Sequence, residues 1–236
     1  MVIREDALAE LGTQVVRCRR CSRLVAWRER VARERRAAYA DWTYWGRPLP
    51  GFGDPGAWLL IVGLAPAAHG ANRTGRMFTG DRSGDFLYAA LHRAGLGSQA
   101  ESRRRDDGLR LQGVYITAVV RCAPPANRPT PEERANCREY LDRELDALTG
   151  VRVILALGGY AYAHVLRTLR ERGHPVPSPT PKFAHGRVVE LGQAATAVLA
   201  SYHPSQQNTF TGKLTAEMLD AVLVRARELA GSRRSR

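Results

Sequence analysis

Trp58-Leu-Leu-Ile-Val-Gly63 is a run of apolar residues with high β propensity, and a loop of small residues, Leu64-Ala-Pro-Ala-Ala-His69, follows it directly. A short, continuous apolar run of this kind is typical of a strand that is buried on both faces of a parallel sheet. Three further runs have the same character, at residues 114–120, 151–157 and 197–202. The sequence therefore predicts a sheet of four buried strands.

Helical patterns separate these strands. We expect helices up to about residue 38, over residues 83–94, from Thr130 onward, and over residues 160–172 and 214–229. Thr130-Pro-Glu-Glu is a strong helix start, because it places a capping hydroxyl, a first-turn proline and two acids where the helix dipole favours them. Strands that alternate with helices predict an α/β fold of three layers, with a central four-stranded, mainly parallel sheet flanked by helices.

The length and the ends of the chain set further expectations. A chain of 236 residues suits one domain over residues 1–236, with a basic tail at residues 232–236. No apolar run reaches the ~18 residues that a membrane span needs. The first residues have no apolar signal-peptide core. We therefore expect a cytoplasmic protein that is not bound to a membrane, and nothing in the sequence indicates an oligomer rather than a monomer.

The charge points to a polyanionic partner. The chain has 36 Lys and Arg residues against 23 Asp and Glu residues, a net charge of +13. Only Lys182 and Lys213 are lysines. A GC-rich genome would explain arginine in place of lysine, but it would not explain the excess of bases over acids. The excess favours nucleic-acid binding.

Polar clusters follow three of the predicted strands, at residues 63–69, 121–127 and 203–208. In a parallel sheet of this type, ligands bind beyond the carboxyl ends of the strands. The three clusters are therefore expected to meet at one edge of the sheet.

Four cysteines stand in the chain, at Cys18, Cys21, Cys122 and Cys137. Two disulfides are not expected in a reducing compartment, so a metal or cluster site is the better interpretation. Four thiolates are the number that a [4Fe–4S] cluster takes. The wide spacing of the second pair is unlike a zinc ribbon, but structural zinc and plain buried cysteines remain open.

Several features now occur in order along the chain. They are the Cys18-Arg-Arg-Cys21 pair, Gly63-Leu-Ala-Pro-Ala67, Gly80-Asp81, the spacing of Cys122 and Cys137, and Tyr202-His-Pro-Ser205. This ordered set resembles the iron–sulfur branch of the uracil-DNA glycosylase superfamily, most closely the family 5 (type b) enzymes, from about Cys18 to Leu229. The resemblance implies a monofunctional enzyme of base excision repair that removes uracil from DNA after base flipping. It also implies a [4Fe–4S] cluster on the four cysteines, in a structural role.

Departures from the related family 4 enzymes refine this resemblance. Family 4 has an acid where this chain has Leu64, and a uracil-reading asparagine where it has Ala118. Both departures are what family 5 shows, and they imply activity on hypoxanthine, xanthine and ethenocytosine as well. Met77 stands where the family commonly has proline.

The resemblance also assigns roles to individual residues. It places the catalytic groups at Asp81, Asn127 and His203, and the ring that stacks on the flipped base at Phe78. Two further sets are expected to meet the base edge and the DNA, respectively: Gly63, Leu64, Ala65, Pro66 and Ala67 in the first motif, and Ser205, Gln206, Gln207 and Asn208 after the last strand. His69 is a further candidate without an assigned role.

Each assignment has a plainer alternative. Asp81 could only cap a helix, His203 could be a satisfied core histidine, Asn127 could be a turn residue, and Phe78 could be core. A non-catalytic iron–sulfur nucleic-acid-binding protein would share the charge and the cysteines. A nucleotide-binding protein is disfavoured, because the first motif lacks both G-x-G-x-x-G and the Walker lysine.

Overall fold

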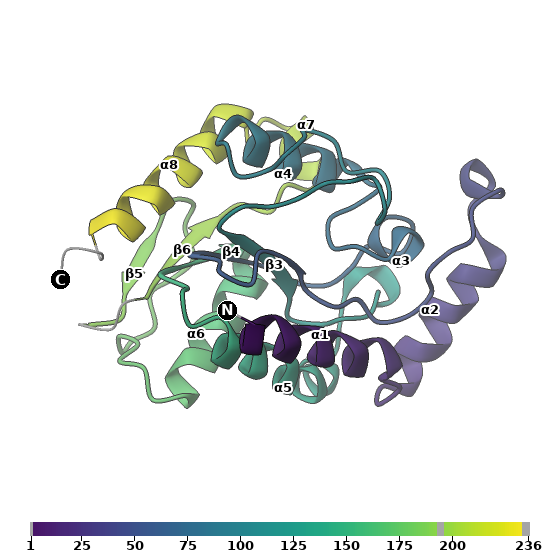
Figure 1. The fold of residues 1–236 in the computed structure, drawn as a ribbon, viewed down its shortest axis with the longest axis horizontal. Helices are drawn as coiled ribbons and strands as arrows, with labels where there is room; N and C mark the ends of the chain where they lie inside the picture. The colour runs from purple at the N-terminus through teal and green to yellow at the C-terminus, as the bar shows by residue number, and fades with distance from the viewer. Residues whose placement is uncertain (1, 193–195, 233–236) are drawn as a thin grey trace.

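The computed structural model describes residues 2–192 and 196–232, and a twisted sheet forms its centre (Figure 1). The four predicted strands are present and run parallel to one another. They are β2 (Leu59–Gly63), β3 (Val114–Ala118), β4 (Val153–Leu157) and β6 (Ala197–Ser201), and every residue in them is buried. The predicted α/β fold with a mainly parallel sheet is confirmed.

Two short edge strands extend this sheet to six strands in the order β1-β3-β2-β4-β6-β5. β1 (Phe52–Gly53) pairs antiparallel with β3, and β5 (Val188–Glu190) pairs antiparallel with β6. The prediction of four strands was incomplete here. Segments of two and three residues are too short to show a periodic pattern, and only pairing with a neighbouring strand makes them extended.

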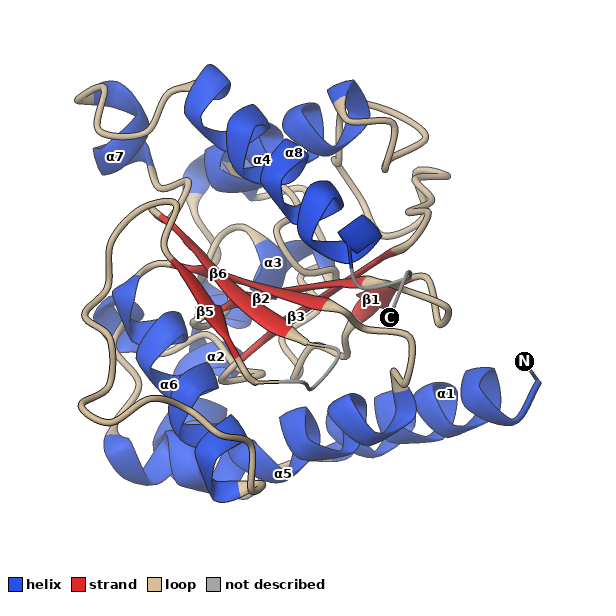
Figure 2. Cartoon of the chain, turned by 90° about the vertical axis from the view of Figure 1, so that its left-hand side faces the viewer, coloured by secondary structure: helices blue, strands red, loops and turns tan. Residues whose placement is uncertain are grey.

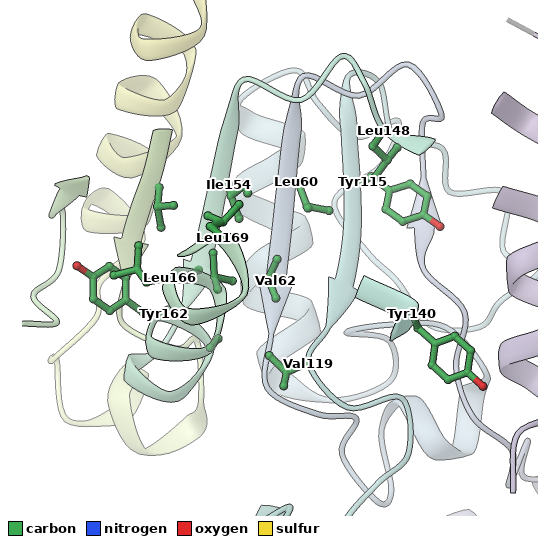
Figure 3. Packing of buried hydrophobic residues seen from close by; sticks show 14 of the residues in the cluster. Leu60, Val62, Tyr115, Val119, Tyr140, Leu148, Ile154, Tyr162, Leu166 and Leu169 are labelled. Carbon is green, nitrogen blue, oxygen red and sulfur yellow. The ribbon is translucent and has the colours of Figure 1, made fainter. Parts of the chain in front are cut away.

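Helices cover both faces of the sheet (Figure 2). One face carries α1 (Val2–Arg17), α5 (Pro131–Ala147) and α6 (Gly159–Glu171), and the other carries α4 (Arg82–Arg93) and α8 (Ala216–Ser232). Alternate strand residues point to opposite faces. Leu60 and Val62 therefore pack toward Leu166 and Leu169 of α6 (Figure 3), while Leu59 and Ile61 join the cluster under α4 and α8.

The N-terminal helical region consists of two α-helices. α1 ends at Arg17, and α2 (Ser22–Glu34) begins after a four-residue break at Cys18–Cys21. A 3-10 turn at Ala37–Tyr39 follows α2. The break turns both cysteines out of helical geometry, and it lets the two helices diverge (Figure 1).

Short elements stand where the central strands end. α3 (Ala71–Thr74) follows β2, a 3-10 turn at Pro125–Asn127 follows β3, and α7 (Gln206–Phe210) follows β6. They hold the chain close to the carboxyl edge of the sheet, where the polar clusters were predicted to meet.

Capping groups define where the longer helices begin. Thr130 Oγ1 accepts a hydrogen bond from the Glu133 amide at 3.2 Å, and the Glu133 carboxylate accepts one from the Thr130 amide at 2.8 Å. Pro131 occupies the first turn. The predicted start of this helix is therefore confirmed as a capping box.

A buried ion pair anchors the segment that follows β3. The Arg121 guanidinium donates two hydrogen bonds to the Glu144 carboxylate, at 2.9 and 2.6 Å, and both side chains are only 1% exposed. Thr117 Oγ1 donates a further bond to Glu144 at 2.7 Å. A charge this deeply buried needs such a partner. The pair fixes the position from which Cys122 and the following loop begin.

The C-terminal helix ends at Ser232, so the rest of the predicted basic tail at residues 232–236 lies outside the described residues. Among the described helices, none is long and apolar enough to cross a membrane.

Candidate active site

Phe78 and His203 lie together beyond the carboxyl ends of β2 and β6, and Asp81 lies against the loop that follows β2. The rings of Phe78 and His203 lie 5.9 Å apart between centroids, inclined by 32°. Phe78 also lies against Gly63, where an added methyl group would come within 2.9 Å of the ring. A methyl group on Gly70 would lie 2.0 Å from Asp81 Oδ2, so the backbone of that loop runs directly past the carboxylate. The two glycines let the loop after β2 approach these side chains closely.

Phe78 is held in an unusual backbone conformation. Its φ is +51°, in the left-handed region that bulky residues rarely adopt. Such strain costs on the order of 1–3 kcal/mol, and it persists only where the surroundings impose it. The side chain is half-buried rather than enclosed. This conformation favours a functional role for the ring over the alternative that Phe78 is plain core.

Neighbouring side chains impose this strained turn. Tyr88 donates a hydrogen bond through its hydroxyl to the Met77 carbonyl at 2.8 Å, and Thr74 donates one to the Thr79 carbonyl at 3.0 Å. Arg73 donates to the Gly80 carbonyl at 2.6 Å. Residues on both sides of Phe78 are therefore fixed by buried donors.

Arg73 is a site residue that the sequence reasoning missed. Its guanidinium also donates to the His69 carbonyl, at 2.8 Å, and lies between the rings of Tyr39 and Trp42, 3.9 and 4.1 Å from their centroids. It therefore ties the first motif, the Phe78 turn and the loop after α2 together. The aromatic-rich stretch at residues 39–45 was the available signal, because clustered rings commonly hold a cation.

Asp81 combines two functions in its surroundings. It is the N-cap of α4, and its Oδ1 accepts a hydrogen bond from the Gly84 amide at 3.0 Å. Burial raises the pKa of Asp81 above its usual value, and hydrogen bonds from the Gly84 and Ser83 amides oppose that rise. Asp81 is therefore a helix cap, as the alternative predicted. A desolvated carboxylate beside Gly70 is also a reactive group, because water screens it poorly.

His203 is a neutral imidazole. Burial lowers the pKa of His203 to about 4. Its backbone carbonyl accepts a hydrogen bond from Asn208 Nδ2 at 2.8 Å. A neutral imidazole keeps one N–H donor that can face a ligand, and it costs less to bury than the charged form.

The first motif presents mostly backbone and small side chains. The carbonyls of Gly63 and Leu64 accept hydrogen bonds from Val119 and Val120, each at 2.9 Å, so this loop continues the β2–β3 pairing. Leu64, Ala65 and Ala67 are half-buried, and Pro66 is buried. His69 is hydrogen-bonded through Nδ1 to the Tyr44 hydroxyl at 3.0 Å.

Asn127 is placed differently from the other predicted catalytic residues. It lies exposed at the end of the 3-10 turn after β3, with φ at +55° beside Ala126 at +53°. Among the described residues, no hydrogen bond or ring contact joins it to Asp81, Phe78 or His203. This positive φ favours the alternative that Asn127 is only a turn residue. Its place after β3 nevertheless keeps it at the edge of the sheet where the polar clusters were predicted to meet.

All four cysteines line one pocket. Cys18 and Cys21, from the break between α1 and α2, are half-buried there, and Cys122 and Cys137 are buried opposite them. Among the described side chains, no group of three or more His, Cys, Asp or Glu residues is arranged to hold a metal ion. Burial raises the pKa of Cys122 to about 11 and that of Cys137 to about 12.

Three N–H donors point at these sulfurs. Arg28 Nη1 lies 2.8 Å from Cys122 Sγ, the Arg121 amide lies 3.3 Å from Cys137 Sγ, and Asn136 Nδ2 lies 3.7 Å from Cys21 Sγ. A thiol is a weak acceptor, whereas a thiolate is a strong one. The donors therefore suit thiolates, the form in which cysteine binds metal.

Comparison with known proteins gives this site a family. The sequence pattern of the Uracil DNA glycosylase superfamily matches residues 50–227. The chain is 55% identical over 226 residues to a "Type-5 uracil-DNA glycosylase" of Mycobacterium bovis, covering 95% of this chain and 82% of that protein. It is 54% identical over 216 residues to one of Thermus thermophilus, covering 91% and 94%. A "Type-4 uracil-DNA glycosylase" of Archaeoglobus fulgidus is 34% identical over 160 residues, covering 66% and 70%.

The chain belongs to the uracil-DNA glycosylase superfamily. Within it, the higher identity to type-5 proteins places the chain in family 5, as predicted from Leu64 and Ala118. The protein is therefore a DNA glycosylase, an enzyme of the hydrolase class.

The predicted DNA-contacting residues of this glycosylase lie at the N-cap and in the first turn of α7. Ser205 caps the helix by accepting a hydrogen bond from the Asn208 amide at 3.4 Å. The Asn208 side chain is turned inward to the His203 carbonyl, so its amide has an internal partner. Gln206 and Gln207 are exposed. Of the four, these two glutamines are the side chains free to reach a ligand.

Buried histidines should make the glycosylase sensitive to acid. Burial lowers the pKa of His164 to about 4, as it does that of His203, whereas unfolded histidine titrates near ~6.5. The unfolded state therefore binds more protons between these values, and stability should fall as the pH drops from 6.5 to 4. At pH 5, His164 alone should cost on the order of 1–2 kcal/mol.

Thermal unfolding at pH 7 and pH 5 measures this effect. His164→Gln should reduce the loss at pH 5, whereas His92→Gln, which changes an exposed histidine on α4, should leave it as in the wild type. An equal loss in all three proteins would contradict the assignment to His164.

Proposed function

We propose that this glycosylase hydrolyses the N-glycosidic bond of uracil in DNA, with Phe78, Asp81 and His203 as the central groups. The observation that carries this proposal is their convergence. The strained ring of Phe78 lies against the imidazole of His203, and the desolvated carboxylate of Asp81 follows Phe78 by three residues and lies against Gly70. An enzyme that removes a flipped base needs an aromatic face on which the base stacks. It also needs nearby groups that stabilise negative charge on the departing base and positive charge on the sugar.

The substrate base must first leave the duplex stack. Extrusion costs a few kcal/mol, least at a mismatched base. Stacking on Phe78 offsets part of that cost, by analogy with the ~1–3 kcal/mol per base seen in single-strand binding. In this proposal Phe78 contacts the face of the base, and His203, whose ring centroid lies 5.9 Å from that of Phe78, reaches its edge.

Bond cleavage separates charge. The bond between C1′ and the base nitrogen breaks, its electron pair goes to the base, and the sugar becomes cationic. His203 donates its ring N–H to the carbonyl oxygen on which negative charge grows, and Asp81 stabilises the sugar cation or orients water. The water oxygen then bonds to C1′, and the proton that the water loses passes through solvent to the nitrogen of the departed base anion. Asn127 is assigned to the base or the water from its motif position. The loop at residues 63–67 shapes the pocket around the base.

The pocket is proposed to accept hypoxanthine, xanthine and ethenocytosine as well. Leu64 has no carboxylate and Ala118 no amide to select the edge of uracil. A site that lacks a dedicated hydrogen-bonding partner rejects related bases only weakly. The partner is therefore DNA with uracil or another deaminated base, and we expect the enzyme to act on it as a monomer in the cytoplasm.

A panel of oligonucleotides tests the proposal. Each carries one uracil, hypoxanthine, xanthine or ethenocytosine, and the product is an abasic site. We expect intact abasic strands, because a glycosylase that also nicks DNA needs an amine for a Schiff base, and Lys182 and Lys213 match no family motif. Borohydride should trap no protein–DNA adduct. Binding without abasic product from any oligonucleotide would favour the non-catalytic alternative instead.

We further propose that the four cysteines hold a [4Fe–4S] cluster. The donor set fits such a group, because four thiols from three chain segments surround one pocket and N–H groups face three of them. When bound, the cluster supplies a cross-link between the N-terminal helices and the segment after β3. Stabilisation of the fold, rather than chemistry, is its proposed role.

A further inference from the structure

A second concave site lies beside α2, outside the group formed by Asp81, Phe78 and His203. It has a volume of about 620 Å³. Its walls are the end of α1, one side of α2 and the loop at residues 45–47. Five arginines line it, together with a single acid, Glu29: Arg17, Arg19, Arg28, Arg33 and Arg47. We call it the arginine pocket.

The charges in the arginine pocket are not balanced. Glu29 is paired with Arg19, through two contacts at 2.5 and 3.3 Å, and lies 3.9 Å from Arg28 Nη2. Within the described part of the chain, Arg17, Arg33 and Arg47 have no carboxylate within 4.0 Å. Several guanidinium groups that share a concave surface repel one another, and an anion relieves that repulsion.

Arg28 provides a second, independent observation. Its side chain is 2% exposed, and no hydrogen-bond partner for its Nε is present among the described residues. Its Nη2 donates to the Cys18 carbonyl at 3.2 Å, so internal partners satisfy this buried guanidinium only in part, and its charge adds to the excess of positive charge in the pocket. Arg28 lines both the arginine pocket and the cysteine pocket, where its Nη1 faces Cys122.

The arginine pocket is tied to the base-binding turn through α3. The amides of Trp45 and Gly46 donate hydrogen bonds to the Arg73 and Asn72 carbonyls at 2.9 and 3.1 Å, and Asn72 Nδ2 donates to the Arg28 carbonyl at 3.3 Å. α2 and α3 lie side by side at this end of the molecule (Figure 1). One short helix therefore separates the pocket from the segment that carries Phe78 and Asp81.

We propose that the arginine pocket binds a backbone phosphate of the DNA strand, on the flank of the extruded nucleotide. Guanidinium groups donate paired hydrogen bonds to phosphate oxygens, and they remain charged at every physiological pH. Hydrogen bonds through α3 link the pocket to the segment that carries Phe78 and Asp81. This inference rests on the proposed action on DNA, but it concerns a separate binding site.

A scan with neutral phosphates tests the proposal. Single methylphosphonates replace one flanking phosphate at a time in a uracil oligonucleotide. KM and, by fluorescence anisotropy, Kd are measured for the wild type, for an Arg33→Gln/Arg47→Gln variant, and for an Arg187→Gln/Arg225→Gln control with the same loss of charge. Arg187 and Arg225 are exposed and lie outside the arginine pocket.

We expect one or two positions at which the neutral group weakens binding by wild type and control roughly 3–10-fold, with kcat unchanged. At those positions the methylphosphonate should not weaken binding by the pocket variant any further, because that variant already lacks the arginine–phosphate contact. Its dependence of log Kd on log salt should also fall by ~0.7–0.9 per lost phosphate contact.

Three results would overturn the proposal. The first is that each methylphosphonate weakens binding by the pocket variant as much as binding by the wild type. The second is that the slope of log Kd against log salt falls as much in the control as in the pocket variant. Inorganic phosphate could also raise the Tm of the wild type and not of the pocket variant while the methylphosphonate scan stays flat, which would assign the pocket to a free phosphate compound. Failure of the proposed function gives a different result, because no uracil oligonucleotide would then yield an abasic site, while anisotropy would still report phosphate contacts.

Discussion

Asp81→Asn should lower the single-turnover rate of uracil excision roughly 100-fold or more, which corresponds to ~2.7 kcal/mol. This substitution separates the catalytic role of Asp81 from its role as a helix cap. The Gly84 amide is capped by Oδ1 of Asp81, and asparagine caps a helix about as well as aspartate. Only the negative charge is lost, and with it the stabilisation of the sugar cation.

The stability of this variant provides its internal control. Burial raises the pKa of Asp81, so the ionised carboxylate is disfavoured in the folded state relative to the unfolded chain. Removing that charge should leave the Tm at pH 7 unchanged or slightly higher, and DNA affinity should change little. The wild-type rate should fall as the pH drops through the raised pKa, because the carboxylate then gains a proton. Excision at close to the wild-type rate by the variant would reduce Asp81 to a helix cap and leave His203 as the main candidate.

Replacing any one of the four cysteines by serine should remove the iron and destabilise the fold. We expect the anaerobically purified wild type to be brown, to absorb broadly near ~400 nm and to contain about four irons per chain. Each variant should lose this absorbance and melt at a lower temperature. A lost ligand releases α1 and α2 from the segment that begins at Arg121 and Cys122.

The different exposure of the four cysteines distinguishes a cluster from cysteines that only pack in the core. If the cysteines only pack, Cys18→Ser and Cys21→Ser should be mild because both side chains are half-buried, while changes at buried Cys122 and Cys137 should be costly. If they bind a cluster, all four variants should lose iron together. Stoichiometric zinc in place of iron in the wild type would also contradict the cluster.

The sequence by itself determined the family and most of the architecture. The four buried strands are continuous apolar runs, and the start of α5 is coded locally by Thr130 and Glu133. Such signals depend on residues near one another in the chain, so they can be read without the fold. The ordered motifs likewise identify family 5, because they depend on residue identity and spacing and not on contacts in the fold.

Other features were decided only by tertiary contacts. β1 and β5 become strands because β3 and β6 offer free edges, and Asn208 turns inward because the His203 carbonyl lies beside it. The sequence contains no local signal for either, since each depends on a partner elsewhere in space.

The strained turn at Phe78 and the arginine pocket were decided in the same way. Arg73 donates to Gly80 from one side of that turn and Tyr88 donates to Met77 from the other, so three segments must meet before Phe78 takes its positive φ. The arginines of this pocket come from α1, α2, the segment between them and the loop after α2. They share one pocket because the helix is interrupted at Cys18–Cys21 and the two helices diverge. The sequence supplied the charge and the motifs, and long-range packing determined which of those groups share a surface.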